Sequence, residues 1–341
     1  MRACRSILQR QQRLALITAV TLLRITGDAL AQPAETAPLQ LEAKIPLGSV
    51  RGRIDHMAVD SKRQRLFVAE LGNDSVAIVD LANRALVRTI TGLKEPQGVG
   101  YDPATDMLYV ANAGDGSVRL FEGNDYAARD RIELGSDADN VRIDAAAGRI
   151  LVGYGSGALA VIDPSTRSKV GDIPVKGHPE SFQIDPDSSQ VFVNVPDARA
   201  VAIVDRVSQK QIGKWPLKDQ GANFPMALDP MRRQVLVIFR APAELGVFSM
   251  TGGRLIAAAE TCGDADDLFI DAKRDRVYVS CGAGFVDVLQ AKGAIYRRIA
   301  RVPTVSGART SLFVPELDRL LVAVRANAET PAAIWVFRPI P

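Results

Sequence analysis

Polar side chains recur along this sequence, each time immediately before a short apolar segment that ends in aspartate. Carboxylates and amides predominate among them, and the chain's two histidines belong to the same set. Carboxylate and amide oxygens are the ligands that Ca²⁺ and Mg²⁺ prefer, and added imidazole nitrogens would suit Zn²⁺ or Mn²⁺. The candidate ligand-binding residues are Asp55, His56, Gln97, Asp139, Asn140, His178, Glu180, Asn223, Asp266, Asp267 and Arg309.

A divalent-cation site is one interpretation of this set, with Asp55, His56, Glu180, Asp266 and Asp267 as candidate ligands. A metal ion held there could polarise a lactone carbonyl and activate water. The histidine spacing argues against it, because His56 precedes its aspartate by four residues and His178 precedes its own by seven. The alternative is that these side chains hydrogen-bond across a water-filled channel, in which case no cofactor is required.

The elements that must position these residues form an internal repeat. The apolar segments end at Asp60, Asp102, Asp144, Asp185, Asp229, Asp271 and Pro315, which are 41 to 44 residues apart. A second and a third segment rich in β-branched and aromatic residues follow each one, and a more polar fourth segment follows those. Seven such units predict an all-β, seven-bladed β-propeller with four strands in each blade. The repeated aspartate is expected to cap the turn after the first strand rather than to act in catalysis.

The ends of the chain predict how the ring closes. The seventh unit reaches Pro341 with no room for a fourth strand, whereas residues 39–47 form a spare strand before the first unit. We expect that strand to complete the last blade, because an open ring would expose strand edges to pairing and aggregation. The propeller then covers residues 39–341, and residues 32–38 are a short flexible lead.

The first 31 residues have the features of a signal peptide. Four arginines precede an apolar stretch at 14–23, which is too short to span a bilayer, and Ala29 and Ala31 form a small-x-small cleavage site. Cleavage predicts a periplasmic or secreted protein with no membrane span; a retained membrane anchor is the alternative. The segment holds five of the 42 basic and one of the 39 acidic residues, so the remaining chain is close to neutral. Such a charge argues against nucleic acid as a partner.

Cys262 and Cys281 are the two cysteines that remain after cleavage. An even pair in an exported chain favours a disulfide, and antiparallel pairing would bring Cys281 opposite the loop that contains Cys262. The bridge would hold the acidic run at 263–267, GDADD, either for rigidity or to support a binding surface.

The repeat resembles the YVTN-repeat β-propellers, and the chain as a whole resembles the secreted YncE-like family. The segments that carry the resemblance are LFVAE (66–70), LYVAN (108–112), VFVNV (191–195), VYVSC (277–281) and the third strands SVAIVD and AVAIVD. The resemblance implies a propeller, but it does not define an activity, since members of the group are described as binding proteins or are uncharacterised. Other propellers of similar shape are lactonases or redox enzymes, and the regucalcin-like lactonases use a comparable channel mouth.

The loops that enter the first strands should line one mouth of the central channel, which is where propellers commonly bind. The leading hypothesis is a non-catalytic binding or interaction module, acting as a monomer, that takes a polar small molecule or a protein loop there. The alternative is a metal-dependent hydrolase of the lactonase type. Binding of single-stranded DNA is a weaker alternative, because only the resemblance suggests it and the near-neutral charge opposes it.

Overall fold

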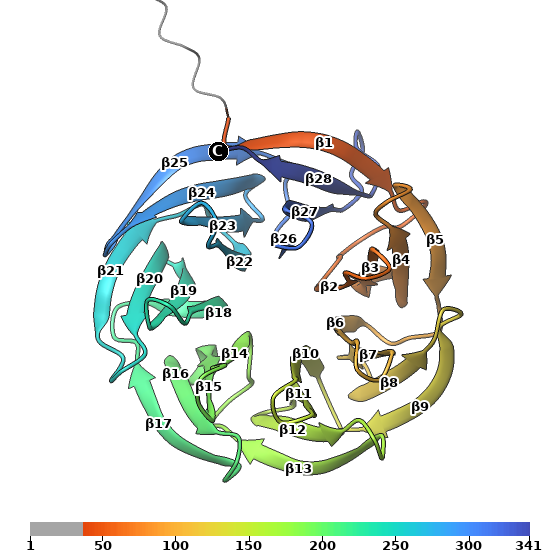
Figure 1. Ribbon diagram of the computed structural model, residues 1–341, viewed down its shortest axis with the longest axis horizontal. Coiled ribbons are helices and arrows are strands. Elements are labelled where there is room, and N and C mark those ends of the chain that lie inside the picture. The colour runs from red at the N-terminus through yellow and green to blue at the C-terminus, as the bar shows by residue number, and fades with distance from the viewer. Residues whose placement is uncertain (1–36) are drawn as a thin grey trace, which may run out of the picture. The chain divides into compact units, whose positions relative to one another are not determined.

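Seven four-stranded antiparallel sheets stand around a central axis in the computed structural model of this protein (Figure 1). The structure describes residues 37–341, so the predicted signal peptide lies outside the described residues. The prediction of a seven-bladed β-propeller is confirmed. Within residues 37–341, no helix has the length and apolar character needed to cross a membrane.

Each blade is a meander whose first strand lies at the channel and whose fourth strand lies at the rim (Figure 1). Blade 1 contains β2 (Met57–Asp60), β3 (Arg65–Glu70), β4 (Ser75–Asp80) and β5 (Ala85–Ile90). Blade 2 contains β6 (Pro96–Asp102), β7 (Met107–Asn112), β8 (Ser117–Glu122) and β9 (Ala127–Glu133). Blade 3 contains β10 (Ala138–Asp144), β11 (Arg149–Tyr154), β12 (Ala158–Asp163) and β13 (Ser168–Pro174). Blade 4 contains β14 (Phe182–Ile184), β15 (Gln190–Val195), β16 (Ala200–Asp205) and β17 (Lys210–Pro216).

The remaining blades follow the same order. Blade 5 contains β18 (Gly221–Asp229), β19 (Gln234–Ala241), β20 (Ala243–Ser249) and β21 (Leu255–Glu260). Blade 6 contains β22 (Ala265–Asp271), β23 (Arg276–Cys281), β24 (Phe285–Lys292) and β25 (Ile295–Pro303). Blade 7 contains β26 (Thr310–Val314), β27 (Arg319–Val324), β28 (Ala333–Pro339) and the N-terminal β1 (Leu39–Pro46). Two short 3₁₀ helices, η1 (Leu71–Asn73) and η2 (Pro196–Ala198), follow the second strands of blades 1 and 4.

The core lies between the blades rather than at the centre of the ring. Successive side chains of a strand face opposite sides of the sheet, so a middle strand supplies two interfaces. In β3, Leu66 and Val68 pack toward blade 7, whereas Phe67 and Ala69 pack toward blade 2. Each of the seven interfaces has an apolar cluster of this kind. This arrangement explains why the second and third segments of every unit are apolar at nearly every position.

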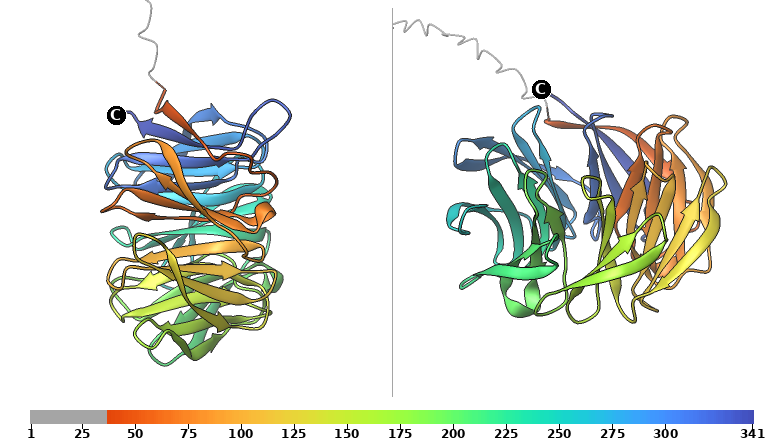
Figure 2. Two further views of the ribbon diagram at one scale, coloured as in Figure 1. Left: turned by 90° about the vertical axis from the view of Figure 1, so that its right-hand side faces the viewer. Right: turned by 60° about the horizontal axis from the view of Figure 1, so that its bottom comes forward.

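The strand β1 closes the ring, as the sequence predicts. It pairs with β28 in antiparallel register from Leu39 opposite Pro339 to Pro46 opposite Ala333. The C-terminus therefore lies beside the start of β1 (Figure 2). The carboxylate of Glu42 joins the two ends of the chain by ion pairs, at 2.5 Å to Arg319 Nε and 3.4 Å to Arg338 Nε.

The repeated aspartate caps the turn between the first and second strands. Asp60 Oδ1 accepts a hydrogen bond from the backbone N–H of Arg63 at 3.1 Å, and Asp271 Oδ1 accepts one from Lys273 at 3.1 Å. In the seventh unit, the predicted end of the first strand is wrong by one residue. Val314 pairs with Arg319 as Asp271 pairs with Arg276, so Val314, rather than Pro315, is the equivalent of the aspartate.

Candidate functional site

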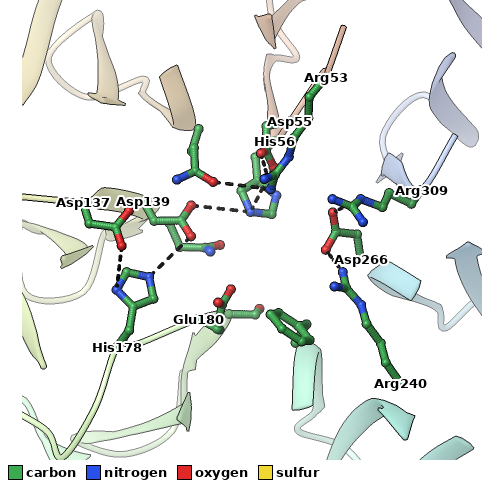
Figure 3. A pocket seen from close by; sticks show the side chains of 14 residues that line it. Arg53, Asp55, His56, Asp137, Asp139, His178, Glu180, Arg240, Asp266 and Arg309 are labelled. Carbon is green, nitrogen blue, oxygen red and sulfur yellow. Dashed lines mark hydrogen bonds and ion pairs between the residues drawn. The ribbon is translucent and has the colours of Figure 1, made fainter. Parts of the chain in front are cut away.

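The predicted mouth of the channel contains a polar cavity of about 200 Å³ to which all seven blades contribute. Nine of the eleven predicted residues line it: Asp55, His56, Gln97, Asp139, Asn140, His178, Glu180, Asp266 and Arg309. Figure 3 shows these side chains converging from different blades on a common space. At this volume the cavity is smaller than the 300–1,000 Å³ of sites for drug-sized ligands, so it suits a small ligand or a single inserted side chain.

β-Bulges at the channel end of the first strands turn side chains into this cavity. The register shifts between Pro96 and Gly98 in β6, and between Ala265 and Asp267 in β22. The residues left without a strand partner there are Gln97 and Asp266, and both line the cavity. Similar bulges in β10 and β18 present Asp139, Asn140 and Phe224. A bulge re-aims a side chain in this way because it adds one residue on one strand.

Two predicted residues do not line the mouth cavity. Asn223 is fully buried and its side-chain amide donates hydrogen bonds to Asn194 Oδ1 and to the carbonyl of Ala200. It joins blades 4 and 5. Asp267 pairs in the strand register with Ser280, beyond the bulge of β22, and faces a second cavity deeper in the channel.

Five lining residues were not predicted from the sequence: Arg53, Asp137, Ser181, Phe224 and Arg240. Arg240 was missed because the second strand of blade 5 continues to Ala241, two residues further than the six-residue second strands of the other blades. The absence of a glycine or asparagine turn after Phe239 is the signal that could have indicated this extension.

One side of the cavity is an imidazole–carboxylate cluster. His178 Nδ1 donates a hydrogen bond to the carbonyl of Gly155 at 2.7 Å and lies 3.4 Å from Asp137 Oδ2, while its Nε2 lies 3.9 Å from Asp139 Oδ2 (Figure 3). Burial lowers the pKa of His178, but Asp139, the Gly155 carbonyl and Asp137 outweigh it and raise the pKa to about 9. His178 is therefore a cation at neutral pH.

His56 lies between three carboxylates. Its Nε2 is 3.8 Å from Asp55 Oδ1 and 3.8 Å from Asp139 Oδ1, and its Nδ1 is 3.9 Å from Asp267 Oδ1. Burial opposes ionisation of the ring, but these carboxylates raise the pKa of His56 above its ordinary value. Burial raises the pKa of Asp55 to about 6, against the opposing effects of His56 and Arg53. For Asp139, the two imidazoles outweigh burial and lower the pKa.

The other side of the cavity is an arginine pair (Figure 3). Both guanidinium groups bind Asp266, Arg240 through Nη2 and Arg309 through Nε at 2.8 Å. Arg309 Nη1 also donates to Asp264 Oδ1 at 2.9 Å, and the guanidinium carbon of Arg240 lies 3.9 Å from the centroid of the Phe224 ring. On this side, the two guanidinium charges are therefore balanced by the carboxylates of Asp264 and Asp266.

Glu180 is the exception among the carboxylates that line the cavity. Asp55, Asp137, Asp139 and Asp266 each have an ion-pair partner within 4 Å, whereas Glu180 has neither an ion pair nor a side-chain hydrogen bond within residues 37–341. Its backbone is fixed, because its N–H donates to the carbonyl of Asn194 at 2.9 Å. Burial, and then the charge of Asp139, raise the pKa of Glu180 to about 7.

Three of the candidate metal ligands lie together, because His56 is 3.8 Å from Asp55 and 3.9 Å from Asp267. Asp266 instead binds the two arginines, and Asp55 also binds Arg53 at 2.7 Å. In the part of the chain that the structure describes, no group of three or more His, Cys, Asp or Glu side chains is arranged to hold a metal ion. The divalent-cation site remains a prediction.

The predicted disulfide between Cys262 and Cys281 is confirmed, with a Cα–Cα distance of 5.8 Å. Cys281 pairs with Ala265 in the register of β22 and β23. The bridge therefore fixes the start of the segment that carries Asp264 and Asp266, the two carboxylates that hold the arginine pair. A disulfide fits a protein of an oxidising compartment.

Comparison with known proteins supports the fold and goes no further. No protein-family model and no curated protein matches the sequence. Among solved structures 1783 chains match, so the fold is widespread and by itself singles out no activity. One is hydrazine synthase of Kuenenia stuttgartiensis, with a TM-score of 0.73 and 17% identity over 83% of this chain and 94% of that one. At that identity the likeness shows a shared β-propeller fold.

Proposed function

We propose that this protein is a non-catalytic binding module that takes a small polar ligand, or one side chain of a partner, at the channel mouth. The ligand carries a positively charged amine that pairs with Glu180. The observation that carries this proposal is that Glu180 is the one lining carboxylate without a cationic partner among the described residues.

The neighbours of Glu180 favour the same ligand chemistry. Asn140 Oδ1 and Asp139 Oδ1 are buried and accept no hydrogen bond from residues 37–341. Buried acceptors without donors are costly, so the surroundings of these atoms favour N–H donors over further acceptors. A primary ammonium group supplies three donors and the positive charge together. Amine binding would also stabilise the ionised form of Glu180, whose pKa is raised to about 7 in the free protein.

Calorimetric titration with propylamine tests the proposal, with 1-propanol and propionate as neutral and anionic ligands of matched size. Propylamine is expected to bind at pH 8 with an affinity that depends on Glu180, whereas neither 1-propanol nor propionate should show binding that depends on this residue. The Glu180→Gln variant should bind propylamine about tenfold more weakly or worse, since a charge-assisted hydrogen bond is lost. Glu316→Gln is the matched control, because Glu316 is exposed in the turn between β26 and β27. Equal affinity of wild type and Glu180→Gln would refute the proposal.

We also propose that the chain belongs to the YncE-like YVTN-repeat group and is exported after cleavage of residues 1–31. The spacing of the repeat and the segments at 66–70 and 108–112 support the first statement. The disulfide supports the second, because such bridges persist in oxidising compartments. Mass spectrometry of the protein from the periplasmic fraction should give a chain that begins at Gln32. A protein that retains Met1 in the membrane fraction would contradict export by cleavage.

A further inference from the structure

A second cavity of about 310 Å³ lies in the channel and shares His56 with the mouth cavity. We propose that this inner cavity is a separate binding site for a small oxyanion, such as a carboxylate or phosphate group, with Arg142 as its cationic partner. The proposal does not rest on the amine site at Glu180, because Arg142 is not part of that site; the two sites share His56 and the negative charge of Asp139.

Arg142 occupies a position that the propeller repeats seven times. The strand registers place Ala58, Gly100, Gln183, Ala227, Phe269 and Leu312 at the equivalent points of the other first strands. All of these except Ala227 line the inner cavity together with Arg142. Arg142 is the only charged residue in this ring, and five of the other six are apolar. Packing alone therefore does not account for an arginine at this point.

The guanidinium of Arg142 has no carboxylate partner. Its Nη1 donates to the carbonyl of Val141 at 2.9 Å, and no carboxylate oxygen of residues 37–341 lies within 4 Å of it. Its carbon lies 5.5 Å from the centroid of the Phe182 ring, which holds the side chain in place. The Nε and Nη2 groups are thus free to donate to a ligand in the cavity. Burial lowers the pKa of Arg142 although the charges of Asp267 and Asp139 oppose it, and an anion in direct contact would offset the burial further.

The other polar groups of the inner cavity are compatible with an anion. Gln183 and Ser311 are hydrogen-bonding neutral side chains, and His56 has a raised pKa because of its carboxylate neighbours. Tyr101 stays neutral, since burial and its hydrogen bond to Asp106 raise its pKa. Among the described residues that line this cavity, Asp267 is the one carboxylate, and burial raises its pKa to about 7. Anion binding should therefore strengthen as the pH falls through 7, since Asp267 then becomes neutral.

A planar guanidinium with two free N–H groups suits the two oxygens of a carboxylate or a phosphate. Titration of the full-length mature protein with sodium acetate and with sodium phosphate, each at constant ionic strength set by sodium chloride, tests the site. One or both anions should raise the melting temperature. With acetate, which is fully ionised at both pH values, the rise should be larger at pH 6 than at pH 8. The anion that gives the larger rise in melting temperature shows whether the site prefers a carboxylate or a phosphate group.

The Arg142→Gln variant should need at least tenfold more anion for the same rise in melting temperature. Its affinity for propylamine at Glu180 should stay within twofold of wild type. Arg119→Gln is the matched control, because Arg119 lies in β8, outside the channel, and also lacks a carboxylate partner in the described chain. Arg142→Lys keeps the charge and should restore part of the response if Arg142→Gln folds poorly. An equal response in wild type and Arg142→Gln, or no response to either anion in wild type, would overturn the inference. A wild-type protein that responds to the anions but does not bind propylamine would instead refute the amine site alone.

Discussion

At the scale of single residues, the mouth is organised by the matching of charges rather than by apolar contacts. The arginines are neutralised by Asp55, Asp264 and Asp266, and the imidazoles by the aspartates around them. Glu180 has no counterpart among the described residues, so the free protein holds a partly buried carboxyl group whose pKa is raised. Burying a charge without a partner is expensive, and a cationic ligand would supply the missing partner.

The cluster around His178 predicts a pH-dependent contribution to stability. Because the pKa of His178 is raised from 6.5 to about 9 in the folded protein, the charged ring stabilises the fold at pH below about 6.5. This stabilisation is lost as the pH rises through 9. The His178→Gln variant should therefore be less stable than wild type by roughly 2 to 3 kcal/mol at pH 6, and the difference should shrink by pH 10.

Urea denaturation of both proteins at the two pH values measures this difference. Asp137→Asn is a useful control, because half of the Asp137 side chain is exposed and its pairing with His178 should contribute less. A His178→Gln difference that stays constant from pH 6 to pH 10 would show that the ring contributes packing and no ion pair.

At the scale of elements, two features set the position of the mouth residues. The first is the bulge at the channel end of the first strands, and the second is close packing between neighbouring first strands. Gly98 in β6 lies against the backbone of Asp139 in β10, and a Cβ at this glycine would overlap the Asp139 carbonyl oxygen. The position of Asp139 in the cavity therefore depends on a residue of another blade.

The disulfide belongs to the same scale, because it connects the entry segment of β22 to the end of β23. Replacing both Cys262 and Cys281 by serine should lower the free energy of unfolding by about 3 kcal/mol, the value expected for a loop of this length. The separation of the two cysteines in sequence is 19 residues. Urea denaturation of the double variant, beside wild type reduced with dithiothreitol, gives the measurement. A double variant as stable as the oxidised wild type would contradict a stabilising role.

At the scale of the whole molecule, β1 holds the ring closed. Ile45 of β1 is completely buried in the cluster between blades 7 and 1, whereas Leu41 of the same strand is 41% exposed. Ile45→Ala should cost about 2 to 4 kcal/mol of unfolding free energy, as large-to-small changes in cores do. Leu41→Ala should change it by less than about 0.5 kcal/mol.

Thermal and urea unfolding measure the loss of stability in the two alanine variants. The two are matched, because both replace a large apolar residue of β1 by alanine. If Ile45→Ala loses no more stability than Leu41→Ala, then β1 does not contribute to the closure of the ring in solution. A broad, multistep transition in Ile45→Ala alone would show that the last blade opens separately from the others.

The fold could be predicted from the sequence because each blade repeats the same apolar pattern, and repetition makes the period and the strand order readable. The closing strand was also predictable, because an unpaired strand at one end matched a missing strand at the other. The one-residue error at Pro315 arose where the seventh unit lacks the aspartate that marks the turn in the other six.

The mouth could be located from the sequence, but its lining could be predicted only in part. A bulge changes which of two adjacent residues faces the channel, and no sequence pattern here marks the bulge. Asn223 and Asp267 were assigned to the mouth for this reason, while Phe224 in the bulge of β18 was missed. Arg142 was not singled out, because its meaning depends on comparing equivalent positions around the ring and on the absence of a nearby carboxylate.

The release of protons on amine binding tests the central claim most directly. Since the pKa of Glu180 is about 7 in the free protein, binding of propylamine at pH 7 should release about half a proton from this carboxyl group. Calorimetry in buffers of different ionisation enthalpy measures that number, and affinity should weaken as the pH falls below 7. We predict clear proton release in wild type that is reduced in Glu180→Gln. Binding of propylamine with no proton release at pH 7, or with the same release in Glu180→Gln, would contradict the pairing of the ligand's positive charge with Glu180.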